Sequence, residues 1–218
     1  MEPILRSISN TDWITLVIFT SILCVVAAKG IFYVRFMNFV ILPFNNKYIF
    51  MYNKKDRLLN WFHILFTFFQ VMNFALLIYF IKDIFFASEN TDSFMTYLLI
   101  LGLLLLFLLI KVSLQLGNGF IFGTNKTISE FIFKKLSYLN YSGIIMFLAN
   151  VILAFVAKDS KTVVYVSIFL ILLINCIGWV TVVKNHQKFI AGNFFYFILY
   201  LCALEITPFV IIGSFLKD

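Results

Sequence analysis

The chain has 218 residues, of which 62% are hydrophobic and 12% are charged, and its mean hydropathy is +1.00. Soluble domains carry about 25% charged residues, so this composition excludes a water-soluble globular protein and indicates a polytopic membrane protein. In a membrane protein the net charge of +7 indicates first the topology and second an affinity for anionic lipid. No nucleic-acid partner is expected, because the basic residues lie in short loops between apolar stretches.

The apolar stretches predict an all-α fold, a single membrane domain built as a bundle of six transmembrane helices. Most of these stretches approach the ~20 residues that cross a bilayer core. Trp13, Trp61 and Trp179 fall toward their ends, where interfacial aromatic residues concentrate. The six helices are expected at residues 13–28, 61–86, 94–116, 138–157, 163–183 and 194–216.

The distribution of basic residues predicts the orientation of this bundle. Eleven lysines and arginines lie on the side of the loops that follow the first, third and fifth spans, five lie on the other side, and Lys111 lies inside a span. The positive-inside rule therefore predicts that the first side is cytoplasmic and that both termini face outward, into the periplasm.

An interfacial amphipathic segment is expected after the first span. Residues 31–44 are apolar but interrupted by polar side chains, so they either dip into the membrane or span it. The basic and aromatic residues that follow predict a helix lying on the cytoplasmic leaflet. A plain connector with snorkelling lysines is the alternative. The residues expected to face lipid headgroups are Lys47, Lys54, Lys55 and Arg57.

Two glycines are expected to end the third span, in the sequence Leu116-Gly117-Asn118-Gly119. We interpret Gly117 and Gly119 as a helix break. They do not indicate a nucleotide-binding loop, because no strand precedes them.

The sequence contains no pattern typical of a catalytic or metal site. The three cysteines lie within apolar spans and form no CxxC, so we expect no metal and no cofactor. His63 and His186 are the only histidines, and we expect both to be interfacial. Because no HExxH or GxSxG motif occurs, we expect a protein that is not an enzyme.

The last apolar stretch carries an acid near its centre. Glu205 there costs at least ~2.5 kcal/mol, even on the most lenient insertion scale. Pro208 lacks an N–H and leaves the carbonyl of Leu204 without its helical partner, which makes it a second helix break. Both features require partners from other helices.

Five of the six predicted spans contain a strongly polar residue at a similar expected depth, and these residues predict one polar layer. Lys111 is the natural counter-ion of Glu205, although Lys111 can instead snorkel to the surface, and Glu205 can instead be protonated or bind amides. The layer is either structural glue between helices or the lining of a path for a proton, ion or substrate. Its members are Gln70, Asn73, Lys111, Asn150, Asn175 and Glu205.

Two stretches, NKYIFMYNKKDRLLNWFHILF at 46–66 and FYFILYLCALEITPFVII at 195–212, resemble an uncharacterised family of polytopic membrane proteins from Bacteroidota bacteria. The resemblance covers most of the chain and implies an inner-membrane location. It gives Glu205 and Pro208 as features of the family type. It implies no established activity, ligand or cofactor.

The function expected from these observations is that of a non-enzymatic subunit or assembly factor of a bacterial envelope complex. The phylum-specific secretion and gliding machinery is one candidate complex, and the expected partners are other membrane subunits and lipids. The alternative is a small proton- or ion-coupled transporter that uses the Glu205–Lys111 pair. A membrane enzyme acting on a lipid carrier through Asp56, Glu130 or His186 is a weaker third hypothesis.

Overall fold

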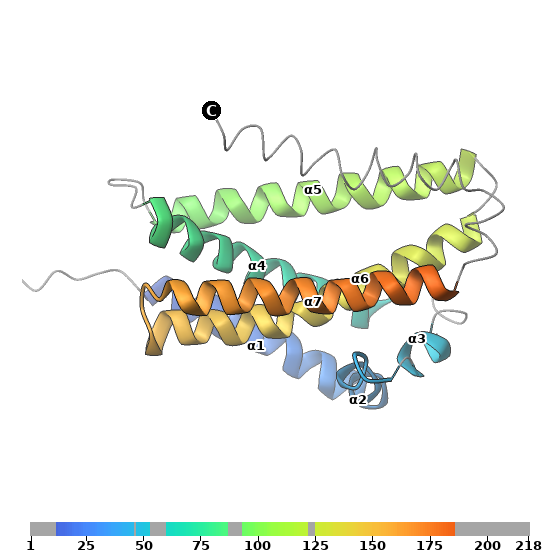
Figure 1. Ribbon diagram of the computed structural model, residues 1–218, viewed down its shortest axis with the longest axis horizontal. Helices are drawn as coiled ribbons and strands as arrows, with labels where there is room; N and C mark the ends of the chain where they lie inside the picture. The colour runs from blue at the N-terminus through green and yellow to red at the C-terminus, as the bar shows by residue number, and fades with distance from the viewer. Residues whose placement is uncertain (1–11, 46, 53–59, 87–92, 122–124, 186–218) are drawn as a thin grey trace, which may run out of the picture.

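The computed structural model describes residues 12–45, 47–52, 60–86, 93–121 and 125–185. All the secondary structure within these ranges is helical (Figure 1). In chain order the elements are α1 Asp12–Ile31, α2 Tyr33–Val40, α3 Lys47–Tyr52, α4 Trp61–Phe86, α5 Ser93–Ile121, α6 Asn125–Val151, the π-helix η1 Ile152–Val156 and α7 Lys161–Asn185.

Five of these helical segments are long and apolar enough to cross a membrane, and each coincides with one of the first five predicted spans. The chain is therefore a multi-pass membrane protein. The sixth predicted span, residues 194–216, lies outside the described residues, and the orientation of the bundle stays a prediction. The five segments are Asp12–Ile31, Trp61–Phe85, Ser93–Gly117, Ile128–Val156 and Lys161–Lys184.

Helices are the expected solution for these segments, because in lipid every backbone N–H and C=O must be bonded within the protein. Local signals set several of the ends. The side chain of Asn60 accepts a hydrogen bond from the Phe62 N–H at 3.3 Å and so caps the start of α4. Asp12 in the first turn of α1 and Lys29 in its last turn complement the helix dipole.

The long helices run along a common direction, and α4 is the central one (Figure 1). It packs against α1, α5 and α6, and α6 packs in turn against α5 and α7. The start of α4, the end of α5, the start of α6 and the end of α7 share one end of the bundle, where α2 and α3 also lie. We call this the α3 end.

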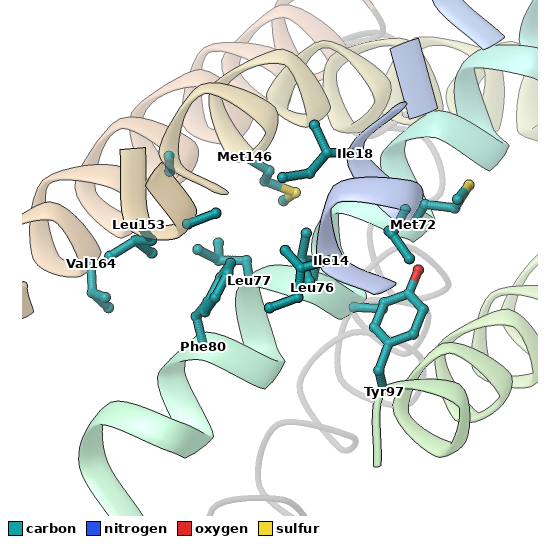
Figure 2. Close-up of a cluster of buried hydrophobic side chains, with 14 residues drawn as sticks. Ile14, Ile18, Met72, Leu76, Leu77, Phe80, Tyr97, Met146, Leu153 and Val164 are labelled. Carbon is teal, nitrogen blue, oxygen red and sulfur yellow. The ribbon is translucent and has the colours of Figure 1, made fainter. Parts of the chain in front are cut away.

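Two clusters of buried apolar side chains hold the bundle together. The first lies toward the end opposite α3, and Figure 2 shows side chains of α1, α4 and α6 converging on it, with Tyr97 joining from α5. The second lies at the α3 end and is dominated by aromatic rings, among them Phe39, Tyr48, Phe62 and Phe66. In lipid such clusters stabilise mainly by close packing, because the surrounding acyl chains are as apolar as the side chains.

Glycines permit close helix contact at two points of this bundle. A Cβ placed on Gly143 of α6 would lie 3.0 Å from the Cα of Gln70 on α4. A Cβ placed on Gly178 of α7 would lie 2.7 Å from the ring carbon Cγ of Tyr138 on α6. Small residues at helix contacts of membrane proteins serve this purpose.

Two predicted boundaries are wrong. Helix α5 continues through Gly117 and Gly119 to Ile121, so these glycines do not break it. A Cβ on Gly117 would meet no atom within 4 Å, and thus neither a turn nor packing requires glycine there. Helix α6 begins at Asn125, thirteen residues before the predicted start at 138, because apolar residues recur at helical spacing among the lysines of this segment.

The segment after α1 does not span the membrane. Helix α2 has eight residues, or ~12 Å at the helical rise, against a hydrocarbon core of ~30 Å. Its exposed side chains are largely apolar and include Tyr33, Val34 and Met37, whereas Phe39 is fully buried against the bundle. This arrangement fits the predicted interfacial segment, with apolar side chains available to lipid.

Candidate functional site

A polar contact joins the middle of α4 to the end of α6. The side-chain nitrogen of Asn150 donates a hydrogen bond of 2.8 Å to the backbone carbonyl of Asn73 and lies 3.4 Å from the Asn73 side-chain oxygen. Asn73 donates in turn to the carbonyl of Phe69 at 2.8 Å. Both asparagines are buried, and their contact fixes the register of the two helices.

Gln70 lies one turn before Asn73 and is also buried, with its backbone against Gly143. Asn175 on α7 bonds the carbonyl of Ile171 in its own helix at 2.8 Å and is only half-buried. Three of the predicted polar residues, Gln70, Asn73 and Asn150, therefore lie together at the α4–α6 contact, and no hydrogen bond described here links Asn175 to them.

The same contact continues to the α3 end, where only residues facing lipid headgroups were predicted. His63, in the first turn of α4, is 2% exposed. Its Nδ1 lies 3.4 Å from the Asn140 amide nitrogen, and its Nε2 lies 3.4 Å from the Tyr48 hydroxyl and 3.5 Å from the Ser137 hydroxyl. Because these distances are long, the three contacts are weak individually, and the cluster depends on all of them.

Asn140 ties this group to the rest of the α4–α6 contact. Its amide nitrogen donates to the Thr67 hydroxyl at 3.1 Å, and its oxygen lies 3.3 Å from the same hydroxyl. Thr67 stands one turn along α4 from His63. The polar side chains thus form a seam parallel to the helix axes, which we define as His63, Thr67, Gln70, Asn73, Ser137, Asn140 and Asn150.

Tyr48 closes the seam from the membrane surface. It stands on α3, is fully buried, and packs against the rings of Phe39 and Phe133. Burial raises the pKa of the Tyr48 phenol, and the positive charge of Arg35 opposes this only in part. The phenol therefore stays protonated and can donate a hydrogen bond.

A pH dependence follows from the buried Tyr48. A group whose pKa is higher in the folded than in the unfolded protein contributes fully to the free energy of unfolding at any pH below its unfolded pKa, which is ~10 for tyrosine. This contribution is lost as the pH rises above that value. We therefore expect the melting temperature of the purified protein to fall between pH 9 and pH 11, and Tyr48→Phe to reduce this fall. An equal fall in the two proteins, measured by intrinsic fluorescence, would show that Tyr48 does not contribute.

Arg35 anchors α2 to the bundle. It is 8% exposed, and its guanidinium carbon lies 4.3 Å from the ring centre of Tyr52 and 5.8 Å from that of Phe62. Cation–π contacts are worth ~0.5–2 kcal/mol and more when water is excluded. They connect α2, α3 and α4 around the outer end of the seam.

Lys111 lies toward the α3 end of the bundle. Its side chain lies close to that of Lys135 on α6, and the Lys135 ammonium lies 4.8 Å from the ring centre of Trp179 on α7. Lys135 is fifteen residues from Asn150 along α6, ~22 Å at the helical rise. Lys111 therefore lies nearer the α3 end than Asn150 does, and the polar layer around Glu205 stays a prediction.

The other predicted site residues are either exposed or outside the residues that the structure describes. Lys47 is exposed at the start of α3, whose first N–H bonds the Asn45 side chain at 3.0 Å. In the ranges that the structure describes, no group of three or more His, Cys, Asp or Glu side chains is placed to hold a metal ion. The remaining residues lie outside the described ranges: Lys54, Lys55, Arg57, Glu205 and Pro208.

The spacing of polar residues in the sequence does indicate the part of the seam that was not predicted. On α4, His63 precedes Thr67 by four residues, and Thr67 precedes Gln70 by three, so all three share a face. On α6, Ser137, Asn140 and Gly143 recur every three residues and also share a face. The predicted start of this span at residue 138 placed Ser137 in a loop and hid the pattern.

Comparison with known proteins identifies the family. The family described as "Domain of unknown function (DUF4271)" matches residues 14–216. The chain belongs to the DUF4271 family. No match is found among curated proteins, and none among solved structures. The match covers all five described spans and the stretch that carries Glu205, so the DUF4271 protein is a polytopic membrane protein over its matched length.

Proposed function

We propose that this DUF4271 protein is a non-enzymatic subunit or assembly factor of a complex in the bacterial inner membrane. The observation that supports this proposal is the seam of polar side chains between α4 and α6. Most of its polar side chains bond one another or the neighbouring backbone at the α4–α6 contact, which suits a rigid scaffold, while the buried Gln70 Oε1 has no hydrogen-bond partner. The secretion and gliding machinery of Bacteroidota is the complex that the sequence resemblance favours.

The faces available to a partner are apolar helices. Helix α5 is the least buried of the five spans, and α1 and α7 also turn large side chains outward. A partner helix in the membrane would pack on such a face through van der Waals contact and small residues. Each face offers a position for a photo-crosslinking residue: Leu16 on α1, Leu109 on α5 and Phe169 on α7.

The test is photo-crosslinking in native membranes, followed by purification in mild detergent. We expect one of the three positions to give a protein adduct of constant mass, while the other two give lipid adducts only. Lipid adducts at all three positions, with a protein that purifies alone as a stable monomer, would contradict the proposal.

A small proton- or ion-coupled transporter is the second candidate. Ionisable side chains inside membrane spans mark transport paths by default, and both His63 and Lys111 lie within described spans. This hypothesis keeps Glu205 as the proton carrier, with Lys111 as its counter-ion. It requires Glu205→Gln to abolish function at normal protein level, and wild-type behaviour of that variant at every external pH would exclude the proton version.

A further inference from the structure

Residues 31–44, which include α2, turn large hydrophobic side chains away from the bundle. Ile31, Val34 and Phe44 are exposed, Phe44 to 90%, and the other exposed side chains of this stretch are also hydrophobic. Among them only Tyr33 carries a polar atom. A helix that lies among headgroups has a charged or polar outer face, so this surface suits acyl chains better than headgroups.

The two strongly polar residues of the stretch, Arg35 and Asn38, are both bonded within the protein. Arg35 is buried, and its guanidinium carbon lies 4.3 Å from the ring centre of Tyr52. Asn38 is half-buried, and its side-chain nitrogen donates a hydrogen bond of 2.9 Å to the Val34 carbonyl of its own helix. Polar groups in hydrocarbon need such internal partners, because no water is there to bind them.

The backbone on either side of α2 is also hydrogen-bonded internally. Between α1 and α2, the N–H of Phe32 donates to the carbonyl of Ala28 at 3.0 Å. After α2, the N–H groups of Phe44 and Asn45 donate to the carbonyl of Ile41 at 3.0 and 2.9 Å. These turns therefore meet the requirement that lipid places on a backbone.

Helix α2 crosses α4 instead of running beside it. Phe32 and Phe39 are seven residues apart, ~10 Å along a helix, yet the ring centres of both lie near that of Phe62, at 6.1 and 5.6 Å. In Figure 1 the turns of α2 overlap one another, whereas the long helices are seen from the side. Since α4 is a candidate span, α2 runs roughly parallel to the membrane surface.

Two ring contacts measure the depth of α2. Its Phe39 ring centre lies 4.6 Å from that of Phe66, which is five residues, ~7.5 Å, beyond the exposed Trp61 at the start of α4. Tryptophan marks the boundary of the acyl region. Phe39 also lies 5.8 Å from Tyr141, thirteen residues into the apolar span of α6 that begins at Ile128. By either measure α2 lies inside the apolar layer.

We propose that α2 lies in the plane of the membrane beneath the headgroups of the leaflet at the α3 end, with its outer face against lipid acyl chains. The chain enters through α1, runs below the surface as α2 and returns to the headgroups at the exposed Lys47 of α3. The inference goes beyond either proposed function, since it requires neither a partner subunit nor transport.

The composition of the stretch favours lipid over another helix as the occupant of this face. Residues 31–44 contain no glycine, alanine, serine or threonine, the small residues on which membrane helices pack closely. The exposed apolar surface of α1, which includes Leu23 and Val26, also continues directly onto α2. Flexible acyl chains can fill the uneven surface that large side chains leave.

Lys29, in the last turn of α1, limits how deep α2 can lie. It is exposed and stands two residues before Ile31. An ammonium group in hydrocarbon is costly, but a lysine near a helix end can extend its side chain to the headgroups. Helix α2 is therefore only as far below the surface as this side chain reaches.

The test is the exposure of a nitroxide spin label to two paramagnetic reagents, with the full-length protein in phosphatidylcholine vesicles. The label is attached at Val34→Cys, in a background in which Cys24, Cys176 and Cys202 are replaced by alanine. Oxygen concentrates in hydrocarbon and a nickel chelate in water. We expect collisions with oxygen to exceed those with nickel several-fold at Val34, as at the mid-span reference Leu106→Cys on α5, and the reverse at Lys47→Cys.

Two results would overturn the proposal. A nickel collision rate at Val34 as high as at Lys47 would place α2 among the headgroups. Low rates with both reagents at Val34, together with a high oxygen rate at Leu106, would show that protein covers the outer face of α2.

A charge introduced into the otherwise native chain provides a second test that does not depend on removing cysteines. Val34→Asp should lower the melting temperature in vesicles, because the side chain is exposed to hydrocarbon, where a carboxylate is costly. Lys47→Asp is the matched control and should have little effect, since Lys47 faces the headgroups. A melting temperature of Val34→Asp no lower than that of Lys47→Asp would also contradict the submerged position.

Discussion

Replacing Gly178 by alanine should destabilise the bundle by about 1–3 kcal/mol, the usual cost of overpacking a closely packed contact. The new Cβ would lie 2.7 Å from Cγ, 2.8 Å from Cβ and 2.9 Å from Cδ2 of Tyr138. These atoms lie near the backbone of α6 and cannot swing aside as the tip of a flexible side chain does. Either α7 or the whole ring must therefore move, and the melting temperature in detergent should fall.

Gly102→Ala on α5 is the matched control, because a Cβ there meets no atom within 4 Å. Alanine is favoured over glycine in helices by about 1 kcal/mol, so this variant should be neutral or slightly stabilised. Tyr138→Ala removes the ring but keeps its Cβ, and should therefore recover only part of the Gly178→Ala effect. A melting temperature for Gly178→Ala equal to that of Gly102→Ala would contradict the close α6–α7 contact.

His63→Leu should also destabilise the protein, by about 1–3 kcal/mol, because it leaves buried polar groups without a partner. The Tyr48 hydroxyl loses its described partner, while Ser137 keeps its bond to the Phe133 carbonyl at 2.7 Å and Asn140 keeps Thr67. The loss should therefore come mainly from Tyr48. It is measured as the melting temperature at pH 8, where Tyr48 is protonated.

A double variant separates this explanation from a simple packing defect. With His63→Leu already present, Tyr48→Phe should cost less than it does alone, with a coupling of about 1 kcal/mol, as found for hydrogen bonds between membrane helices. Ser167→Ala serves as the control, since Ser167 is buried but bonds the Val164 carbonyl of its own helix. Strict additivity of His63→Leu and Tyr48→Phe would show that the two side chains do not interact.

Hydropathy predicted the helices well, because in lipid an apolar stretch of sufficient length has almost no alternative to a helix. The predicted second and fifth spans agree with α4 and α7 within two residues at each end. The boundaries failed where turn or loop signals were read as in a soluble protein. Glycine did not end α5, and the lysines before residue 138 did not exclude helix, since their aliphatic stems can cover an apolar surface.

The polar residues were identified more reliably than their arrangement. Counting residues from the ends of the predicted spans placed Gln70, Asn73 and Asn150 at comparable depths in the membrane, and these residues do meet at the α4–α6 contact. Depth alone says nothing about which helices are neighbours, however, and the layer across all the spans stays a prediction. The position of Lys111 depended on Lys135, which had been assigned to a loop because the start of α6 was missed.

The short helices α2 and α3 lie at one end of the bundle, with no counterpart among the described elements at the other (Figure 1). The described part of the molecule therefore has a larger cross-section in one leaflet than in the other. A cross-section that differs between the leaflets makes the energy of insertion depend on the curvature of the bilayer, as it does for amphipathic helices that lie in the interface. The apolar side chains of α2 thus add a sensitivity to membrane shape that a bundle of straight spans would lack.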